Sequence, residues 1–262
     1  MSGLDTLRLK LLLAYDGTTF HGFAPQKEHE TVGGALIGAF EKLTKIEVDL
    51  TCAGRTDKGV HALGQVVHFD LPAELLGEDP VETLNRWKKS LNSQLYPRIS
   101  IFDISLCDSE FNARRDALSR TYRYLIREGP NFVPWEKNTV WHVGQYLDRS
   151  LLDLGITPLV GEHDFSSFCR KPPDKEGSLV RKVLECRFEE HSGLLEFTIT
   201  STSFCHQMVR SIVGLLVEVG KGKVKPSQVK SILEARDRSA SLPLAPPSGL
   251  CLIKVRYDRN LP

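Results

Sequence analysis

One short segment, from Gly54 to His61, concentrates ionisable side chains between glycines. Asp57 is its only carboxylate, and the basic groups around it belong to Arg55, Lys58 and His61. A carboxylate surrounded by cations is what a site needs when its Asp must stay ionised at neutral pH. Gly54 and Gly59 would let the backbone approach a ligand closely. The segment therefore predicts a binding or catalytic loop, and the alternative is a solvated loop whose charges face water.

Two other runs place cations beside aromatic or apolar residues. In the run Arg-Thr-Tyr-Arg-Tyr, residues 120–124, the rings of Tyr122 and Tyr124 fall on one face of a predicted strand, a pattern typical of core packing. Arg210 lies about 100° around a predicted helix from Val209, at the border of its apolar stripe. At that border a guanidinium either extends to water or pairs with a carboxylate.

The elements that must position these residues follow from periodicity and from turn residues. In the first part of the chain, leucines alternate with other residues from Leu7 to Leu13, the period of a strand. Thr31 is placed to cap a helix with an apolar stripe, and Pro80 suits the first position of a second helix. We expect strands at 7–13, 48–52, 65–71 and 99–106, and helices from Thr31 and from Pro80 to Leu95. This β-α-β-β-α-β order is that of a ferredoxin-like unit.

The second part of the chain repeats this order loosely. We expect strands at 118–127, 180–189, 194–202 and 250–257, and helices at 145–159, at 206–219 and from Pro226. Ser192-Gly193 is the turn between the second and third of these strands. The sequence thus predicts an α+β fold of two ferredoxin-like (βαββαβ) halves, residues 1–107 and 108–262. Their mainly antiparallel sheets would join, with a cleft between them.

Composition narrows the classes of function. The formal net charge of +1 argues against a globally basic nucleic-acid binder. Cations clustered after residue 110 could still form a local basic surface that binds nucleic acid. No apolar run reaches the length of about 18 residues that a membrane span needs. The six cysteines form no CxxC pair and no metal-ligand spacing. We therefore expect reduced thiols, no metal site, and a cytoplasmic protein without a membrane segment.

The string Gly-Arg-Thr-Asp-Lys-Gly-Val-His-Ala at 54–62, running on into Gly-Gln-Val-Val-His-Phe at 64–69, closely resembles the signature of the TruA family of tRNA pseudouridine synthases. Further similarities to this family lie at 15–18, 20–22, 31–32, 111–117, 120–124, 204–214 and 245–252. The resemblance thus covers nearly the whole chain. Two departures concern Lys58, where many bacterial members have a small residue, and Phe23-Ala24-Pro25, which replaces the usual Trp-Gln.

The resemblance also implies roles for individual residues. Asp57 would be catalytic, Tyr122 would stack on the uracil, and Arg210 would pair with the Asp. The implied substrate-binding residues are Arg55, Thr56, Lys58, His61, Arg120 and Leu250. Structural hydrogen bonding is the alternative for His61, as it is for His21 and His206, and Tyr124 would serve in packing.

The activity that the resemblance implies is isomerisation of uridine to pseudouridine in tRNA, in the anticodon stem-loop at tRNA positions 38–40. The cleft would then be the RNA-binding active site, working without cofactor, nucleotide or metal in a homodimer. Because this sequence departs from the family pattern at Lys58 and at Phe23-Ala24-Pro25, the sequence does not establish which tRNA uridines are modified. One alternative is a tRNA-binding module whose catalysis has lapsed, which the intact Asp57, Tyr122 and Arg210 disfavour. Another is a carboxylate-dependent glycosidase, but that chemistry needs a pair of carboxylates and the loop offers only Asp57.

Overall fold

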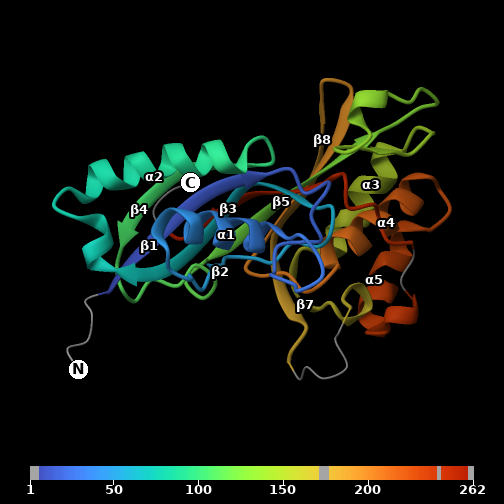
Figure 1. Ribbon diagram of the computed structural model, residues 1–262. Helices are drawn as coiled ribbons and strands as arrows, with labels where there is room; N and C mark the ends of the chain where they lie inside the picture. The colour runs from blue at the N-terminus through green and yellow to red at the C-terminus, as the bar shows by residue number, and fades with distance from the viewer. Residues whose placement is uncertain (1–5, 171–176, 241–242, 259–262) are drawn as a thin grey trace. The chain divides into compact units, whose positions relative to one another are not determined.

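The computed structural model describes residues 6–170, 177–240 and 243–258, and Figure 1 shows their helices and strands. The chain forms two compact units. The first runs to Leu118 and takes in the chain again from Leu252, and the second runs from Ser119 to Cys251. Each unit is of mixed α+β type and contains a mostly antiparallel sheet.

The first unit follows the predicted order of strands and helices. Its elements are β1 (Thr6–Tyr15), α1 (Val32–Thr44), β2 (Thr51–Cys52), β3 (His61–Pro72), α2 (Pro80–Leu95) and β4 (Ile99–Cys107). β1 pairs antiparallel with β3 on one side and with β4 on the other, and β2 pairs antiparallel with β3. The last strand, β10 (Leu250–Arg256), lies beside β3 and so brings the end of the chain into this sheet.

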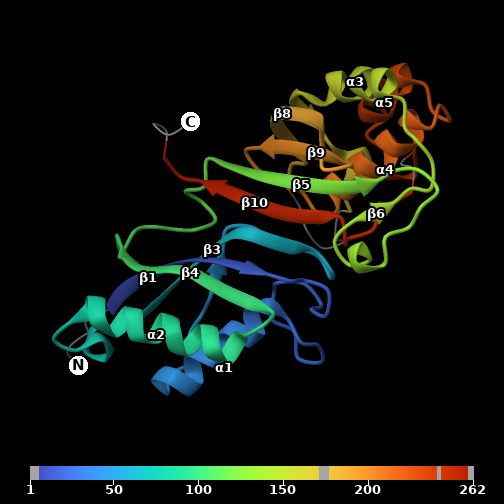
Figure 2. The same ribbon diagram turned by 90° about the horizontal axis from the view of Figure 1, so that it is seen from above.

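Helices α1 and α2 lie on one face of this sheet, as Figure 2 shows. The alternation along β1 places Leu9, Leu11 and Leu13 in the core, where all three are 0% exposed. On α1, the Phe40 ring packs edge-on against Phe69 of β3, with 4.7 Å between the ring centroids. Burial of each such side chain contributes about 1.5–3 kcal/mol, so this face anchors the loops at the ends of the strands.

Both helices of the first unit begin where the sequence predicts. Thr31 caps α1, and its Oγ1 accepts a hydrogen bond from the Gly34 N–H at 3.1 Å. Asp79 caps α2 by accepting from the Glu82 N–H at 2.9 Å, and Pro80 occupies the first turn, where no N–H is needed. These caps satisfy backbone donors that the helix itself leaves unpaired.

The second unit is built on a sheet in the order β5-β9-β8-β7, with the short β6 parallel to β5. Its elements are β5 (Ser119–Arg127), β6 (Trp141–His142), α3 (Arg149–Ile156), β7 (Gly161–Asp164), β8 (Val180–His191), β9 (Leu194–Ser201), α4 (Met208–Gly220) and α5 (Pro226–Ala235). Short 3-10 turns of the chain are Ala73–Leu76, Pro134–Glu136, Thr157–Leu159, Ser166–Phe168 and Arg238–Ala240. Helices α3, α4 and α5 gather on one side of the sheet in both views (Figures 1 and 2).

The turn between β8 and β9 confirms the predicted hairpin. Ser192 and Gly193 have φ of 52° and 74°. Two consecutive positive φ values belong to the tight hairpin turn whose twist matches that of the flanking strands.

Four predicted elements had wrong boundaries. The strand expected at 48–52 is only Thr51–Cys52, and the one expected at 65–71 already begins at His61. The helix expected at 145–159 is confined to Arg149–Ile156, because Asp148 caps it and Pro158 lies in the 3-10 turn that follows. The helix expected from His206 starts at Met208, since Gln207 before it has a φ of 66°.

The expectation of six reduced thiols was also wrong. Cys169 and Cys205, whose Cα atoms are 5.7 Å apart, are paired as a disulfide. Cys52, Cys107, Cys186 and Cys251 form no disulfide, and burial raises the pKa of the Cys52 thiol to about 11. Within residues 6–170, 177–240 and 243–258, no helix has the length and apolar character required to cross a membrane.

Candidate active site

The loop that carries Asp57 lies between β2 and β3 and is fixed at its first residues by Gln65 of β3. The Gln65 side chain is 0% exposed. Its Nε2 donates to the Gly54 carbonyl at 2.7 Å, and its Oε1 accepts from the Gly54 N–H at 3.4 Å. The neighbouring Ala53 N–H donates to the Val66 carbonyl at 2.8 Å. A single buried amide therefore holds both polar backbone groups of Gly54.

Thr56 ties the middle of the loop to β1. Its Oγ1 and the Tyr15 hydroxyl are 2.8 Å apart in a buried hydrogen bond, and Gln65 Nε2 also donates to the Tyr15 hydroxyl at 3.4 Å. The Thr56 carbonyl accepts from the Phe23 N–H at 3.1 Å. Thr56, predicted to bind substrate, thus faces the protein interior and positions the residue that follows it.

Asp57 stands at the tight turn that ends the loop. Its carbonyl accepts from the Val60 N–H at 3.1 Å, and Gly59 supplies the positive φ of 79° that this turn requires. The Asp57 side chain is half-buried, whereas Arg55 and Lys58 on either side are exposed. A carboxylate on a fixed turn with basic neighbours is a suitable group for nucleophilic or base chemistry.

The segment before α1 packs closely on this turn, and His61 holds it there. A Cβ on Gly17 would lie 2.0 Å from the Val60 carbonyl oxygen, so only glycine fits at this position. The Gly17 N–H donates to His61 Nδ1 at 3.1 Å. His61 is 9% exposed, and its Nδ1 lies 3.2 Å from Asp16 Oδ1. The structure thus gives His61, predicted to bind substrate, a hydrogen bond that orders the backbone beside Asp57.

Lys58 is held by a histidine. Its Nζ lies 2.9 Å from His21 Nε2, and the His21 ring stacks on His29 with 4.2 Å between centroids. Because an ammonium only donates, Nε2 is the acceptor and the His21 proton sits on Nδ1. Desolvation, followed by the charges of Lys58 and His29, lowers the pKa of His21. His21 is therefore neutral at physiological pH and holds the Lys58 ammonium on the loop surface.

In the second unit, Tyr122 and Tyr124 of β5 have different surroundings. The Tyr122 ring is 7% exposed and meets Phe204 edge-on, with 5.1 Å between centroids. Tyr124 is fully buried, its hydroxyl donates to the Pro246 carbonyl at 2.7 Å, and burial raises its pKa. The prediction of a packing role for Tyr124 is confirmed.

Arg210 lies in the first turns of α4 and is braced by the segment before β10. Its Nε donates to the Ala245 carbonyl at 2.8 Å, and the Ala245 N–H donates back to the Arg210 carbonyl at 3.1 Å. Gly214 makes this close approach possible, since a Cβ there would lie 1.8 Å from the Pro243 carbonyl oxygen. With Nε held in this way, the terminal nitrogens of the guanidinium are the part that an anion would meet.

The two other predicted residues of this unit are also buried. Arg120 is 8% exposed and donates from Nη1 to the Thr202 carbonyl at 2.8 Å. Leu250 is 6% exposed at the start of β10. The predicted residues therefore form two groups. One is the loop of the first unit with Arg55, Thr56, Asp57, Lys58 and His61, and the other is the set Arg120, Tyr122, Arg210 and Leu250 of the second.

Sequence reasoning missed two residues that fix the loop, Tyr15 and Gln65. The signal for Gln65 was a polar residue directly before the apolar pair Val66-Val67 in a predicted strand. A buried amide there needs partners, and here these are the polar groups of Gly54. No group of three or more His, Cys, Asp or Glu side chains suited to a metal ion occurs among the described residues.

Comparison with known proteins identifies the class to which this loop and fold belong. A family model described as tRNA pseudouridine synthase matches residues 12–114 and 156–258. The chain belongs to this family, whose reaction is the isomerisation of uridine in tRNA. The site residues named above lie within the matched ranges, apart from Arg120 and Tyr122.

Relatives match the chain over nearly its whole length. It is 40% identical to "tRNA pseudouridine synthase A" of Maridesulfovibrio salexigens, over 97% of this chain and 91% of that protein. Proteins of the same name from Geobacillus sp. and Bacillus subtilis are 38% and 35% identical, over 96% of this chain in both cases and over 98% and 100% of the relatives. The similarity therefore includes the stretch around Tyr122 that the family model leaves unmatched.

Proposed function

We propose that this chain converts uridine to pseudouridine in the anticodon stem-loop of tRNA, with Asp57 as the catalytic carboxylate. The observation that carries the proposal is the loop from Gly54 to His61. It matches the family signature, and buried contacts from Gln65 and Tyr15 fix it around one half-buried Asp. Such contacts hold a reacting group in a defined geometry.

The reaction rearranges one nucleotide without net gain or loss of atoms. The bond between N1 of uracil and C1′ of ribose breaks, the uracil turns, and a bond forms between C5 and C1′. The proton on C5 leaves and N1 gains one. Asp57 starts this sequence as a nucleophile or as a base. Because the target base must leave its stack, the free energy of flipping is lowest for uridines in a loop.

Other residues of the proposal act around the base. Tyr122 stacks on the uracil, and its oxygen takes up the C5 proton as the hydroxyl's own proton passes to solvent. Arg55, exposed beside Asp57, fills the space that the base leaves. Arg210 keeps Asp57 ionised through the terminal nitrogens of its guanidinium. This role of Arg210 is supported by its reciprocal hydrogen bonds with Ala245, which fix the position of the guanidinium.

We assign two ferredoxin-like halves, residues 1–107 and 108–262, supported by the strand order β4-β1-β3-β2 in the first. We further propose a cytoplasmic homodimer that binds tRNA across both subunits, supported by the family resemblance. Sedimentation equilibrium at micromolar concentration tests the dimer, and a mass of one chain at all concentrations contradicts it.

The experiment that tests the function measures tritium release from tRNA labelled at C5 of uridine, followed by mapping of pseudouridine in the product. We expect release with pseudouridine confined to the anticodon stem-loop. Tight tRNA binding without any release would favour the lapsed binding module. Pseudouridine formed only elsewhere in the tRNA would overturn the choice of target.

A further inference from the structure

Lys58 directly follows Asp57 on the tight turn that ends the catalytic loop. Consecutive Cα atoms are about 3.8 Å apart, so the two side chains leave the backbone close to each other. The Lys58 side chain is exposed, whereas that of Asp57 is half-buried. Any nucleotide that reacts with Asp57 has a phosphate on each side of its ribose. The Lys58 ammonium, on its flexible four-carbon stem, is therefore placed near the RNA backbone at the reacting nucleotide.

His21 orders this ammonium without offsetting its charge. Lys58 Nζ donates to the neutral His21 ring at Nε2 over 2.9 Å. An ammonium has three N–H donors, so two of them and the full positive charge are left for a ligand. Within residues 6–170, 177–240 and 243–258, no carboxylate forms an ion pair with Lys58.

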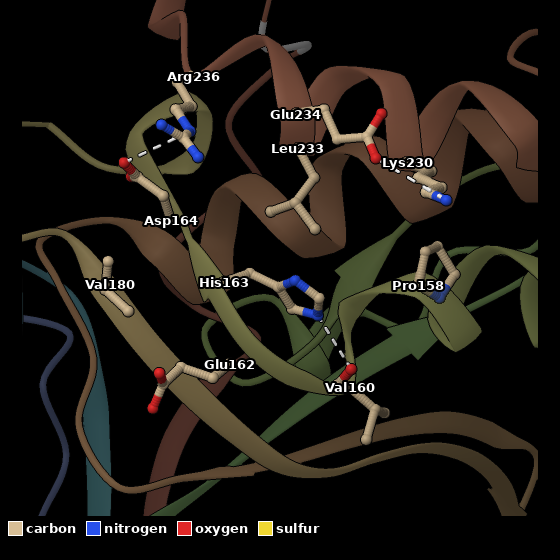
Figure 3. Close-up of a pocket in the computed structure, with 10 residues that line it drawn as sticks. All are labelled: Pro158, Val160, Glu162, His163, Asp164, Val180, Lys230, Leu233, Glu234 and Arg236. Atoms are coloured by element: carbon tan, nitrogen blue, oxygen red, sulfur yellow. Dashed lines mark hydrogen bonds and ion pairs between the residues drawn. The ribbon is translucent and has the colours of Figure 1, made fainter.

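A lysine of the second unit has the opposite kind of partner. In the cavity that Figure 3 shows, Lys230 Nζ lies 3.8 Å from Glu234 Oε1, and the two side chains form an ion pair. The carboxylate there offsets the charge of the ammonium that it contacts. The His21 imidazole does not, so the position of Lys58 favours an anionic ligand.

The His21 ring is itself held in place. The His21 N–H donates to the Glu30 carbonyl at 2.9 Å, and Gln26 Nε2 donates to the His21 carbonyl at 3.0 Å. The ring stacks on His29, with 4.2 Å between centroids and 9° between planes. Because these contacts fix the acceptor, Lys58 is ordered before RNA binds and loses less conformational entropy on binding.

The two departures from the family pattern, Lys58 and Phe23-Ala24-Pro25, lie on segments that pack directly against each other. The Phe23 N–H donates to the Thr56 carbonyl at 3.1 Å. A Cβ on Gly22, whose φ is 89°, would lie 2.8 Å from the Thr56 carbonyl oxygen and 3.4 Å from the Lys58 nitrogen. The segment that carries one departure thus also supplies the partner of the other.

We propose that the Lys58 ammonium, positioned by His21, binds a phosphate that flanks the target uridine. This contact rests on the proposed function, which places the reacting uridine at Asp57. A small residue at position 58, as in many bacterial members of the family, would be too short to make it. A phosphate contact carries no sequence information, so Lys58 fixes the position of the RNA strand at the loop and not the identity of the base.

Phosphate ethylation interference tests this contact on a complete tRNA transcript. Ethylation removes the negative charge of single phosphates, and the tRNAs that still bind are separated and mapped. The protein carries Asp57→Asn so that the uridines stay unmodified during binding. We expect ethylation of one phosphate beside the target uridine to weaken binding to this protein, but not to the same protein with Lys58→Ala. The target uridine is the one that the wild-type protein converts.

The affinity for unmodified tRNA gives a second measure of the same contact. Lys58→Ala should raise Kd roughly fivefold at low salt, the weight of one exposed charge pair. It should also flatten the slope of log K against log salt by about 0.7, the value for one neutralised phosphate on a single strand. Lys42→Ala is the matched control, since Lys42 is an exposed lysine of α1 in the same unit, and it should leave the interference pattern unchanged.

Identical interference patterns with and without Lys58→Ala would overturn the proposal. An interference site that Lys58→Ala removes at a phosphate away from the target uridine would overturn it as well.

His21→Leu and His21→Gln test the positioning role of His21. The glutamine amide oxygen lies near the place of Nε2 and still accepts from Lys58, whereas leucine has no acceptor. His21→Leu should therefore weaken the interference at the same phosphate, and His21→Gln should restore it. In a protein that already carries Lys58→Ala, His21→Leu should not weaken binding further, because His21 acts through Lys58. Equal interference in the Leu and Gln variants would remove His21 from this role.

Tritium release by the wild-type protein separates the phosphate contact from the proposed function. Release together with an interference pattern that does not depend on Lys58 would remove the contact and keep the function. A phosphate whose interference depends on Lys58, in a protein that releases no tritium, would keep Lys58 as an RNA contact and remove the proposed function.

Discussion

Asp57 is the residue on which the proposed chemistry depends, and removing its charge tests this directly. Asp57→Asn keeps the size of the side chain, so the buried contacts of Thr56 and Gly54 should hold the loop as before. We expect pseudouridine formation to disappear while tRNA affinity changes by less than about tenfold, or 1.4 kcal/mol. Tritium release and anisotropy measure the two quantities.

Asp49→Asn provides the matched control, because Asp49 is an exposed aspartate shortly before β2 in the same unit. It should leave both turnover and affinity unchanged. Turnover retained by Asp57→Asn would remove Asp57 from the catalytic role.

Tyr122 and Tyr124 offer a matched pair on one strand. If the Tyr122 oxygen takes up the C5 proton, Tyr122→Phe keeps the ring against Phe204 and binds tRNA normally but turns over at least about a hundredfold more slowly. Tyr124→Phe loses the buried hydrogen bond to Pro246, so its melting temperature should fall while turnover persists. Equal turnover in both variants would leave Tyr122 as a stacking surface only.

The sequence indicated which residues form the functional loop, but it did not indicate which other residues those side chains contact. The spacing of Gly54, Asp57 and Gly59 indicated a functional loop, and the loop is a fixed turn. The sequence did not show that Thr56 and His61 face inward. Their hydrogen-bond partners are distant in the sequence: Tyr15 lies 41 residues from Thr56, and Gly17 lies 44 residues from His61. Such contacts arise only when β1 and β3 pair.

At the element scale, Gln65 links β3 to the catalytic loop. Gln65→Leu fills similar volume but leaves the N–H and C=O of Gly54 without their buried partner, which costs about 1–3 kcal/mol per group. We expect a lower melting temperature and a lower kcat with little change in KM, because the Asp57 turn loosens while the RNA-binding surface stays. Single-turnover kinetics and thermal melting measure these effects.

Gln65→Glu separates packing from positioning. The carboxylate still accepts from the Gly54 N–H but no longer donates to the Gly54 carbonyl, so kcat should lie between those of wild type and Gln65→Leu. A variant Gln65→Leu with normal kcat despite reduced stability would show that Gln65 is structural only.

The packing of α4 on the segment before β10 predicts a contrast between two glycines. Gly214→Ala places a Cβ within 1.8 Å of the Pro243 carbonyl oxygen, so the helix must move and we expect a loss of at least about 2 kcal/mol. Gly38→Ala in α1 meets no atom within 4 Å and should stabilise the protein by up to about 1 kcal/mol. Urea denaturation measures both, and equal effects would contradict the close approach.

Element types were predictable where periodicity and caps agreed, and boundaries failed where tertiary contacts decide them. Thr31 and Asp79 marked helix starts correctly because capping is local. The residues from Val48 to Leu50 have strand-like composition, yet the ladder with β3 begins at Thr51. The αL conformation of Gln207, which delays α4, also has no local signal.

At the scale of the whole molecule, near-neutral charge coexists with many carboxylates whose pKa is lowered by a specific partner. They occur in both units: Asp16, Glu30, Asp70, Asp148, Asp164, Glu189, Glu218 and Asp237. A depressed folded-state pKa adds stability that is complete above the unfolded pKa, near 4, and is lost as pH falls through the folded value. Stability should therefore begin to fall below about pH 6.5, because the pKa values of His21 and His68 are also lowered by folding, and it should fall more steeply below about pH 4.5, where the carboxylates are protonated.

The pair of Arg8 and Asp70 allows this acid dependence to be measured for one carboxylate. Arg8 Nε and Nη2 donate to the two Asp70 oxygens at 2.6 and 2.7 Å, and this hydrogen bonding lowers the pKa of Asp70. Since the Asp70 side chain is 46% exposed, Asp70→Asn should cost no more than about 1 kcal/mol, or a few degrees in melting temperature. The difference from wild type should be constant above about pH 5 and should vanish towards pH 2. Glu47→Gln, at an exposed position before β2, should show no such change, and a gap for Asp70→Asn that persists at low pH would mean that the pair does not act through its charge.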